Sequence, residues 1–186
     1  MKTFYTVFFT LLLVGCSESV KKEGVDIKSE VSRLIDDESK INYLERIYES
    51  DQSIREESKL IDLKYPRDSK ENLEFRKSMI ELDSLNLLKI EAYLNQYGYP
   101  SDNSFGYNAT IAPILVVHHT MKEGVREKYF KMFHSAYLDG VIDKNFYAFY
   151  LGRMYQIKFG ERMSSNSLSN EAEIAALIEA MGLEIN

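Results

Sequence analysis

Two polar residues, Asp83 and Asn86, are the first candidates for chemistry in this chain. They lie three positions apart in a segment with helical periodicity, which puts both side chains on one helix face. Such a pair can bind a ligand or orient a catalytic base. It can also be a solvated surface or a hydrogen bond to a neighbouring helix, so the pair alone does not define a site.

Two adjacent histidines, His118 and His119, end an apolar run. Neighbouring residues on a helix point about 100° apart, whereas zinc-binding helices present ligands at i and i+3 or i+4. We therefore expect no metal and no other cofactor. His119 shares a helix face with Ala112 and Leu115, so it is either a core histidine or a general base, a role that suits histidine near neutral pH. We expect His134 to be peripheral.

One cation, Arg153, interrupts the apolar stretch from Tyr150 to Tyr155. A buried cation needs a partner, and Asp83 is the partner that we predict. The sequence thus indicates a candidate binding or catalytic cluster of Asp83, Asn86, His119 and Arg153. It shows no nucleophile elbow, phosphate loop or dinucleotide-binding glycines, so the cluster points to no particular reaction.

Cys16 is the only cysteine, and it follows Lys2 and an apolar run from Phe4 to Val14. A basic start, about 7–15 apolar residues and a small residue before the cut are the parts of a secretion signal. The run is too short for the roughly 20 residues of a membrane-spanning helix. Leu13-Val14-Gly15-Cys16 resembles a bacterial lipobox. The resemblance implies that residues 1–15 are removed and that acyl chains on Cys16, palmitate among them, anchor the protein in a bilayer.

The composition after this cut disfavours several partners. About 170 residues would remain, enough for a real core, with 22 Lys and Arg against 29 Asp and Glu, a net charge of −7. This balance disfavours nucleic acid and anionic lipid surfaces. We expect a monomer on a polar tether, residues 16–25, that binds an unknown protein or small molecule. We place it at the bacterial cell envelope, on the outer membrane where the cell has one, because Ser17 is not the aspartate that retains some lipoproteins at the inner membrane.

The periodicity of the chain predicts an all-α fold, a compact bundle of about six or seven helices. Ile27, Val31, Leu34 and Leu44 repeat at intervals typical of one helix face. They predict a long amphipathic helix over Asp26–Ser50, within an N-terminal helical segment over residues 26–66. Its apolar stripe could form a coiled-coil seam, but we favour packing against the rest of the chain.

A second helical segment is predicted over residues 67–186. Its helices are expected over Ser69–Gln96, Asn108–Thr120, Glu127–Leu138, Lys144–Phe159 and Glu171–Met181. Leucine and isoleucine recur every seven residues in the first of them, from Leu73 to Leu94. Asp68 with Glu71 and Asp143 are the predicted helix caps.

From Asp83 onward the chain resembles a bacterial family catalogued as domain of unknown function 6624. The matching residues are Asp83 with Asn86, Gly98-Tyr99-Pro100, Gly106, His118-His119, Arg153 and Gly182-Leu183. The family glutamine before its histidine is His118 here, the aspartate before its arginine is Gly152, and its Gln-x-Tyr-Gly segment is blurred. The resemblance implies a helical fold and a polar cluster that is partly lost in this chain, and it implies no reaction.

Three functions follow as hypotheses. The first is an envelope lipoprotein whose helical domain binds a ligand or partner through the candidate cluster. The second is an envelope hydrolase that uses His119 as its general base. The third is a structural coiled-coil protein of the envelope.

Overall fold

The computed structural model describes residues 27–122, 124–163 and 170–185. Over these residues the chain is helical, with short turns and no strand, so the predicted all-α fold is confirmed. The elements are α2 (Asp37–Lys64), α3 (Lys70–Tyr97), the 3-10 turn η1 (Asn103–Phe105), α4 (Gly106–His119), α5 (Val125–Leu138), α6 (Lys144–Phe159) and α7 (Asn170–Met181). The predicted signal peptide, Cys16 and tether lie outside the described residues.

The bounds predicted for the first helix are wrong. Residues 27–32 are helical, but a turn follows them and α2 begins only at Asp37. The Asp36 carboxylate starts the new helix because it accepts a 2.8 Å hydrogen bond from the Ser39 backbone N–H, and the Ser39 hydroxyl lies 3.4 Å from the Asp36 nitrogen. This reciprocal pair is a capping box. The region that was predicted as one helix therefore forms two.

The apolar stripe of this region packs into the chain's own core. Ile27, Val31, Leu34 and Leu44 are all buried. The Tyr97 hydroxyl lies 2.9 Å from the carbonyl oxygens of both Val31 and Leu34, where the first helical stretch ends. The residues proposed for a coiled-coil seam are therefore already covered by the molecule itself.

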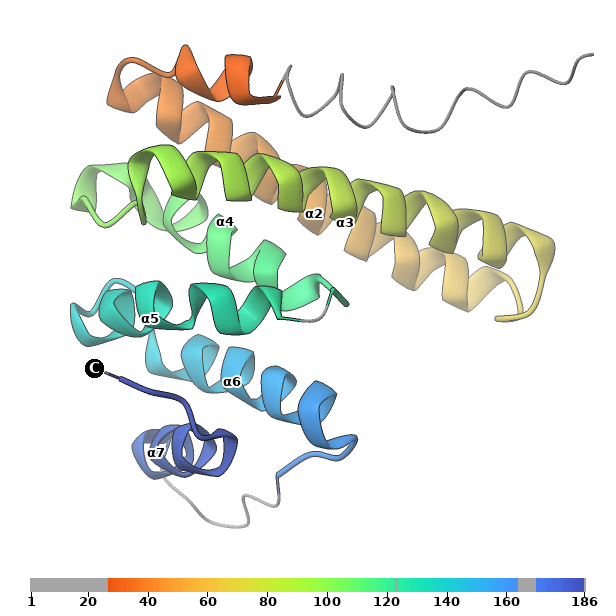
Figure 1. The fold of residues 1–186 in the computed structure, drawn as a ribbon. Coiled ribbons are helices and arrows are strands. Elements are labelled where there is room, and N and C mark those ends of the chain that lie inside the picture. The colour runs from red at the N-terminus through yellow and green to blue at the C-terminus, as the bar shows by residue number, and fades with distance from the viewer. Residues whose placement is uncertain (1–26, 123, 164–169, 186) are drawn as a thin grey trace, which may run out of the picture.

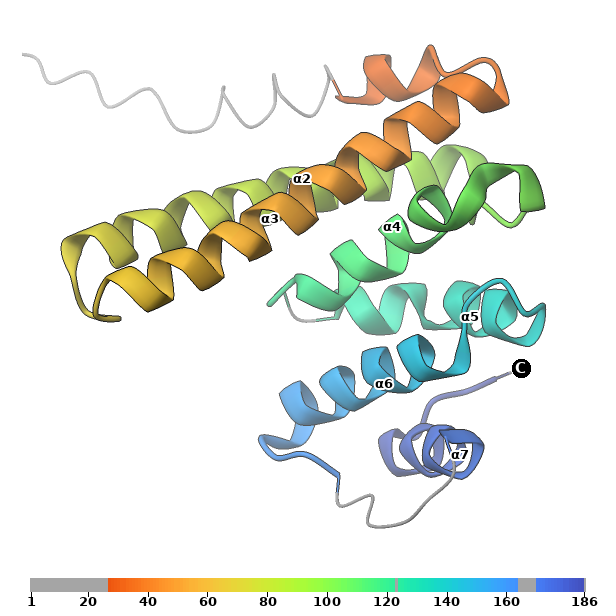
Figure 2. The ribbon, with the colours of Figure 1, turned by 180° about the vertical axis from the view of Figure 1, so that it is seen from behind.

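Helices α2 and α3 form a long antiparallel hairpin that extends beyond the other helices (Figures 1 and 2). Ser69 begins α3 by accepting a hydrogen bond from the Asn72 backbone N–H at 3.2 Å, so the cap predicted at Asp68 is displaced by one residue. Only part of the seven-residue repeat of apolar side chains in α3 faces the core. Leu87 and Leu94 are buried, but Leu73 and Ile80 are 56% and 62% exposed.

Helix α4 lies between the α2–α3 hairpin and the remaining helices (Figure 1). All its residues from Ile111 to His118 are buried. A helix that is apolar on every side must pack against other elements on every side. Helices α2, α3, α5 and α6 all contact α4. Because α4 is held from both sides, its last residue, His119, has a defined position next to the hairpin.

Helices α5, α6 and α7 complete the body of the protein. Asp143 caps α6 as predicted, since its carboxylate accepts hydrogen bonds of 3.0 Å from the backbone N–H groups of Asn145 and Phe146. The turn at Gly160 has φ of +81°, which glycine adopts without strain and which ends α6. Among the described helices, none is long and apolar enough to cross a membrane.

Candidate functional site

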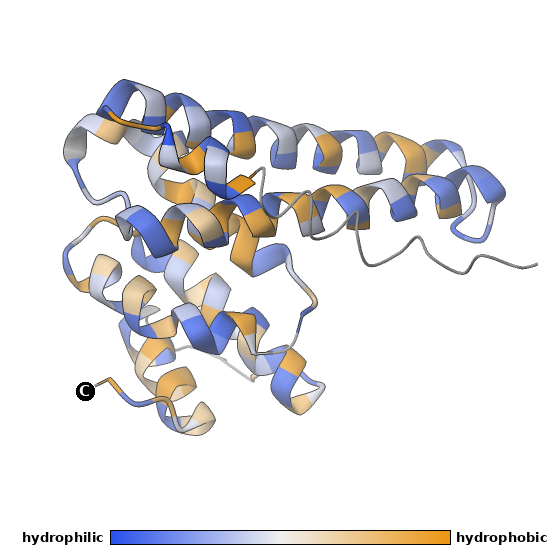
Figure 3. Cartoon of the chain, turned by 45° about the horizontal axis from the view of Figure 1, so that its top comes forward, coloured by the Kyte–Doolittle hydropathy of each residue, from blue (hydrophilic) through white to orange (hydrophobic). Residues whose placement is uncertain are grey.

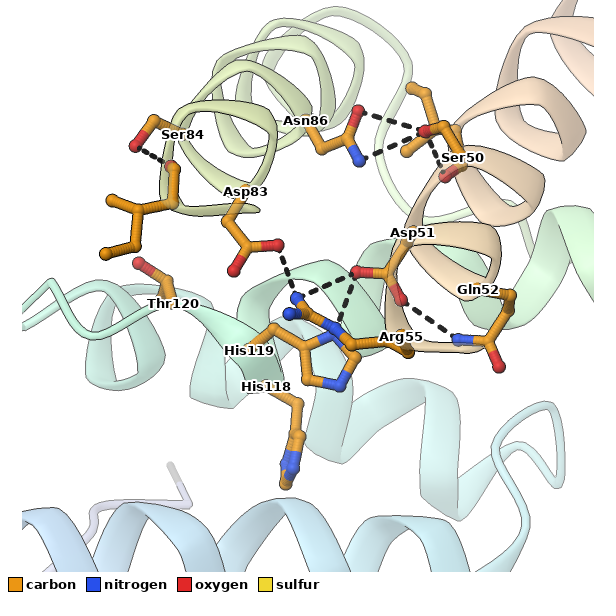
Figure 4. Close-up of polar contacts among 12 residues, drawn as sticks. Ser50, Asp51, Gln52, Arg55, Asp83, Ser84, Asn86, His118, His119 and Thr120 are labelled. Carbon is orange, nitrogen blue, oxygen red and sulfur yellow. Dashed lines mark hydrogen bonds and ion pairs between the residues drawn. The ribbon is translucent and has the colours of Figure 1, made fainter. Parts of the chain in front are cut away.

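The candidate site lies where the middle of the hairpin meets the end of α4. Helix α2 contributes Asp51 and Arg55, α3 contributes Asp83, and α4 contributes His119 (Figure 4). These residues come from three helices, so the geometry depends on tertiary packing. The four side chains form one continuous network of hydrogen bonds and ion pairs, which we call the Asp51 network.

Asp51 is the centre of this network. Its side chain is 1% exposed, and its Oδ1 lies 2.8 Å from Nδ1 of His119. Its Oδ2 accepts a 2.9 Å hydrogen bond from the Gln52 amide, and Arg55 Nη2 lies 3.4 Å from Oδ1. A buried carboxylate that bonds one ring nitrogen of a histidine fixes the orientation of that ring. Asp51 therefore acts as the orienting group for His119.

Arg55 links the two carboxylates, because the same Nη2 also donates to Asp83 Oδ1. Burial raises the pKa of the Asp51 carboxyl, but the hydrogen bond from His119 and the positive charges of His119 and Arg55 outweigh it, and the net pKa is lowered. Burial also raises the pKa of Asp83, and Arg55 only partly offsets this, so the net pKa is raised. The two carboxylates are thus electrostatically unequal, with Asp51 the more firmly ionised.

His119 and Asp83 are the members of the network that line a groove. The His119 side chain is 22% exposed, and within the described part of the chain no hydrogen bond reaches its Nε2 atom. The groove has a volume of about 500 Å³ and runs along α3 and the turn after α4. Its walls are mainly apolar, and besides His119 and Asp83 they include Ile80, Leu87, Leu88, Glu91 and Met121. An apolar groove with a few convergent polar groups is typical of small-molecule sites.

Two of the four predicted site residues, Asp83 and His119, line this groove together. Asn86 is 2% exposed and points away from the groove, toward Ser50, whose hydroxyl accepts a 3.1 Å hydrogen bond from its amide (Figure 4). Asn86 joins α2 to α3 just beside the network.

The fourth predicted residue, Arg153, lies elsewhere, and its predicted pairing with Asp83 is wrong. Its Nη1 donates to Gln156 Oε1 at 3.0 Å, and its Nη2 lies 3.3 Å from the sulfur of Met121. It lines a separate groove along α6 and α7. The partner of Asp83 is Arg55, which comes from the other helix of the hairpin.

His118 and His134 are both core histidines. His118 is 5% exposed, points away from the Asp51 network and stacks on Phe149 with 4.2 Å between ring centroids (Figure 4). Burial lowers the pKa of His118 to about 3, so its ring is neutral. The expectation that His134 is peripheral is wrong, because it is buried and its Nδ1 lies 2.9 Å from the Tyr147 hydroxyl.

Sequence reasoning missed Asp51 and Arg55, although one signal was present. Asp51 follows Leu44 by seven residues and Ile47 by four, so it falls on the apolar stripe of its helix. A carboxylate in a buried stripe requires partners. Its position therefore indicated a buried polar network. Arg55 lies one helical turn later, so it is the expected partner of Asp51 in that network.

Two hydroxyl groups line the groove. The Ser84 hydroxyl donates to the Ile80 carbonyl at 2.7 Å, and the Thr120 hydroxyl accepts from the Lys122 backbone N–H at 3.1 Å. The oriented histidine could bind a ligand or take a proton from water. Among the described residues no group of three or more His, Cys, Asp and Glu side chains could hold a metal ion.

Comparison of the chain with protein-family models, with curated proteins and with solved structures finds no match. The resemblance to domain of unknown function 6624 therefore rests on the motif residues alone and stays a prediction.

Proposed function

We propose that the chain is a lipid-anchored protein of the bacterial cell envelope whose helical domain binds a small ligand in the groove beside His119. The single observation that carries the binding role is the 2.8 Å contact of His119 Nδ1 with buried Asp51, which fixes the orientation of the His119 ring at an apolar groove. The expected ligand is largely apolar and carries one hydrogen-bonding group. The lipobox residues at Cys16 support the anchor.

The binding role is tested by filling the groove. Leu88 lines it and is 38% exposed, so Leu88→Trp should block the groove without disturbing the core. Leu73→Trp is the matched control, because Leu73 lies on the same helix, is 56% exposed and does not line the groove. Fragment binding is measured by ligand-observed NMR on residues 17–186. We expect hits that bind wild type and Leu73→Trp but neither Leu88→Trp nor His119→Ala. Hits that bind all four proteins equally would contradict the proposal.

A hydrolase is the second candidate, and the same carboxylate–imidazole contact favours it. In this alternative His119 takes a proton from water while Asp51 holds the ring and stabilises the imidazolium that forms. Turnover of a panel of p-nitrophenyl esters is the measurement. His119→Ala should abolish turnover in a protein that is still folded by circular dichroism, and His134→Gln serves as the comparison for a histidine outside the groove. Activity that survives His119→Ala would rule out this mechanism.

A further inference from the structure

A second groove, separate from the one beside His119, lies between the start of α5 and the last turns of α6. Its volume is about 730 Å³, within the range of roughly 300–1,000 Å³ that small-molecule sites occupy. Arg126 lines it, with Lys122 and Lys158 beside it and Met121, Met154 and Ile157 as its apolar part.

Arg126 is the unusual group in this groove, because it is a buried cation. The residue is 4% exposed. Its Nη2 donates to the His118 carbonyl at 2.5 Å and to the Thr120 carbonyl, at the C-terminal end of α4. Its Nε atom is buried without a hydrogen-bond partner. Two carbonyls and the negative end of a helix dipole offset part of the cost of burying this charge, but they supply no counter-ion.

The described residues provide no carboxylate for Arg126. Ion pairs within 4.0 Å in the described part of the chain do not include it, and burial and the like charge of Arg153 lower its pKa. Glu127 also lines the groove, but its Oε1 lies 3.5 Å from Lys158 Nζ. Buried guanidinium groups are normally paired. The guanidinium group of Arg126 is therefore a candidate for binding an anion.

The charge of the groove is opposite to that of the whole chain. Among the described residues that line the groove, Lys122, Arg126 and Lys158 against Glu127 give a local net charge of +2, whereas the chain carries −6. Lys158 also donates to the Met181 carbonyl at 3.0 Å, which limits the motion of its ammonium group. The apolar residues on the same walls would contact a hydrocarbon part of a ligand.

We propose that this groove binds a small amphipathic anion, with its phosphate or carboxylate at Arg126 and its hydrocarbon part against Met154 and Ile157. A guanidinium suits this role because its planar N–H groups match the oxygens of both anions. The site is distinct from the His119 groove, although Met121 and Lys122 line both. It does not rest on the proposed function, and the two can fail independently.

Calorimetric titration of residues 17–186 with octyl phosphate tests the proposal. We expect binding at micromolar to submillimolar concentration that weakens as salt is raised, because the contact is ionic. Inorganic phosphate should bind at least tenfold more weakly, and octyltrimethylammonium should not bind. The absence of octyl phosphate binding at millimolar concentration would overturn the proposal.

Variants locate the site without removing Arg126, whose loss could unfold the protein. Ile157→Glu places a carboxylate beside Arg126 and should abolish binding while the melting temperature is kept. Lys122→Ala with Lys158→Ala should weaken binding about tenfold, and Lys144→Ala, on the same helix as Lys158, should leave it unchanged. His119→Ala should also leave it unchanged.

Two further outcomes would overturn the proposal. The first is binding lost in His119→Ala but kept in Ile157→Glu, which would place the ligand in the other groove. The second is sedimentation with phosphatidylglycerol vesicles but not phosphatidylcholine vesicles, without binding of monomeric octyl phosphate, because the surface would then recognise a membrane.

Discussion

At the scale of single residues, the two carboxylates of the site differ in what they contribute to the fold. Asp51 is 1% exposed with a lowered pKa, whereas Asp83 is 19% exposed with a raised pKa. We expect Asp51→Asn to lower the free energy of unfolding by about 3 kcal/mol at pH 7, because it leaves Arg55 and His119 without their buried anion. The matched variant Asp83→Asn should change it by less than about 1 kcal/mol. Urea unfolding measures both.

The pH dependence of this difference follows from the sign of each pKa shift. Because the pKa of Asp51 is lowered on folding, its charge stabilises the fold above about pH 4, and this stabilisation is lost as the pH falls through the lowered value. The deficit of Asp51→Asn should therefore shrink below about pH 4. Asp83 behaves in the opposite way, since its raised pKa favours the protonated form in the folded state. A deficit of Asp51→Asn that grows with acidity would contradict this assignment.

His118 should make the stability of the fold depend on pH over a higher pH range than Asp51 does. Burial lowers its pKa to about 3, so the folded protein excludes the proton that the unfolded chain takes up below about pH 6.5. Stability should fall by about 1 kcal/mol per pH unit between these limits. His118→Phe should reduce this slope and keep the stacking on Phe149. Phe149→Leu is the control, because it removes the stacking but leaves the titrating group; an unchanged slope in His118→Phe would refute the assignment.

The pattern of the sequence identified part of the site at this scale. Helical spacing indicated Asp83, and the end of an apolar run indicated His119. It could not show that Asp83 pairs with Arg55, because the two lie 28 residues apart on antiparallel helices and meet only after the hairpin has closed. The same reason explains the wrong partner for Arg153, since spacing along one helix carries no information on which helix packs beside it.

At the scale of elements, the hairpin of α2 and α3 divides into a packed base and a distal arm, residues 56–82. Asn72 is the only buried residue of the arm. Leu60, Leu63, Leu73 and Ile80 are all exposed, and Figure 3 shows hydrophobic and hydrophilic residues mixed along the hairpin. With so few buried apolar contacts, the arm should open locally far more readily than α4.

Hydrogen exchange measures this difference. We expect the backbone amides of the arm to exchange at least 100-fold faster than those of residues 111–118 in α4, because α4 opens only when the core unfolds. Asn72 holds the end of the arm together: its amide donates to Asp62 at 2.9 Å, and its oxygen accepts from Arg76 at 2.8 Å. Asn72→Ala should accelerate exchange in the arm alone. Glu57→Ala, at an exposed position in the same arm, should have little effect, and equal protection of arm and core would contradict the division.

The bounds of most helices were predictable because capping residues mark them locally. Asp143 and Gly160 bracket α6 as expected. The break before α2 was missed for a physical reason: Val31, Leu34, Ile41 and Leu44 keep the spacing of one continuous stripe across it. Periodicity alone therefore indicates a single helix, whereas the capping box of Asp36 with Ser39 starts a second one.

At the scale of the whole molecule, the lipobox prediction implies that acyl chains on Cys16 hold the helical domain at a membrane. Two or more acyl chains hold a protein on a membrane far more firmly than one. We therefore expect attachment to depend on the acylated Cys16. In a bacterial host, the full chain should take up radiolabelled palmitate and partition into the detergent phase of Triton X-114. Cys16→Ser should lose both properties.

A control separates lipidation from general hydrophobicity. Residues 17–186, produced in the cytoplasm, should enter the aqueous phase, because a chain that carries 22 Lys and Arg against 29 Asp and Glu and buries its apolar helix α4 offers little to detergent. If this shortened protein also enters the detergent phase, its exposed leucines and not Cys16 hold it at membranes. If Cys16→Ser partitions like wild type and still takes up palmitate, the lipobox assignment fails, and Cys16 is then an ordinary cysteine after an apolar N-terminus.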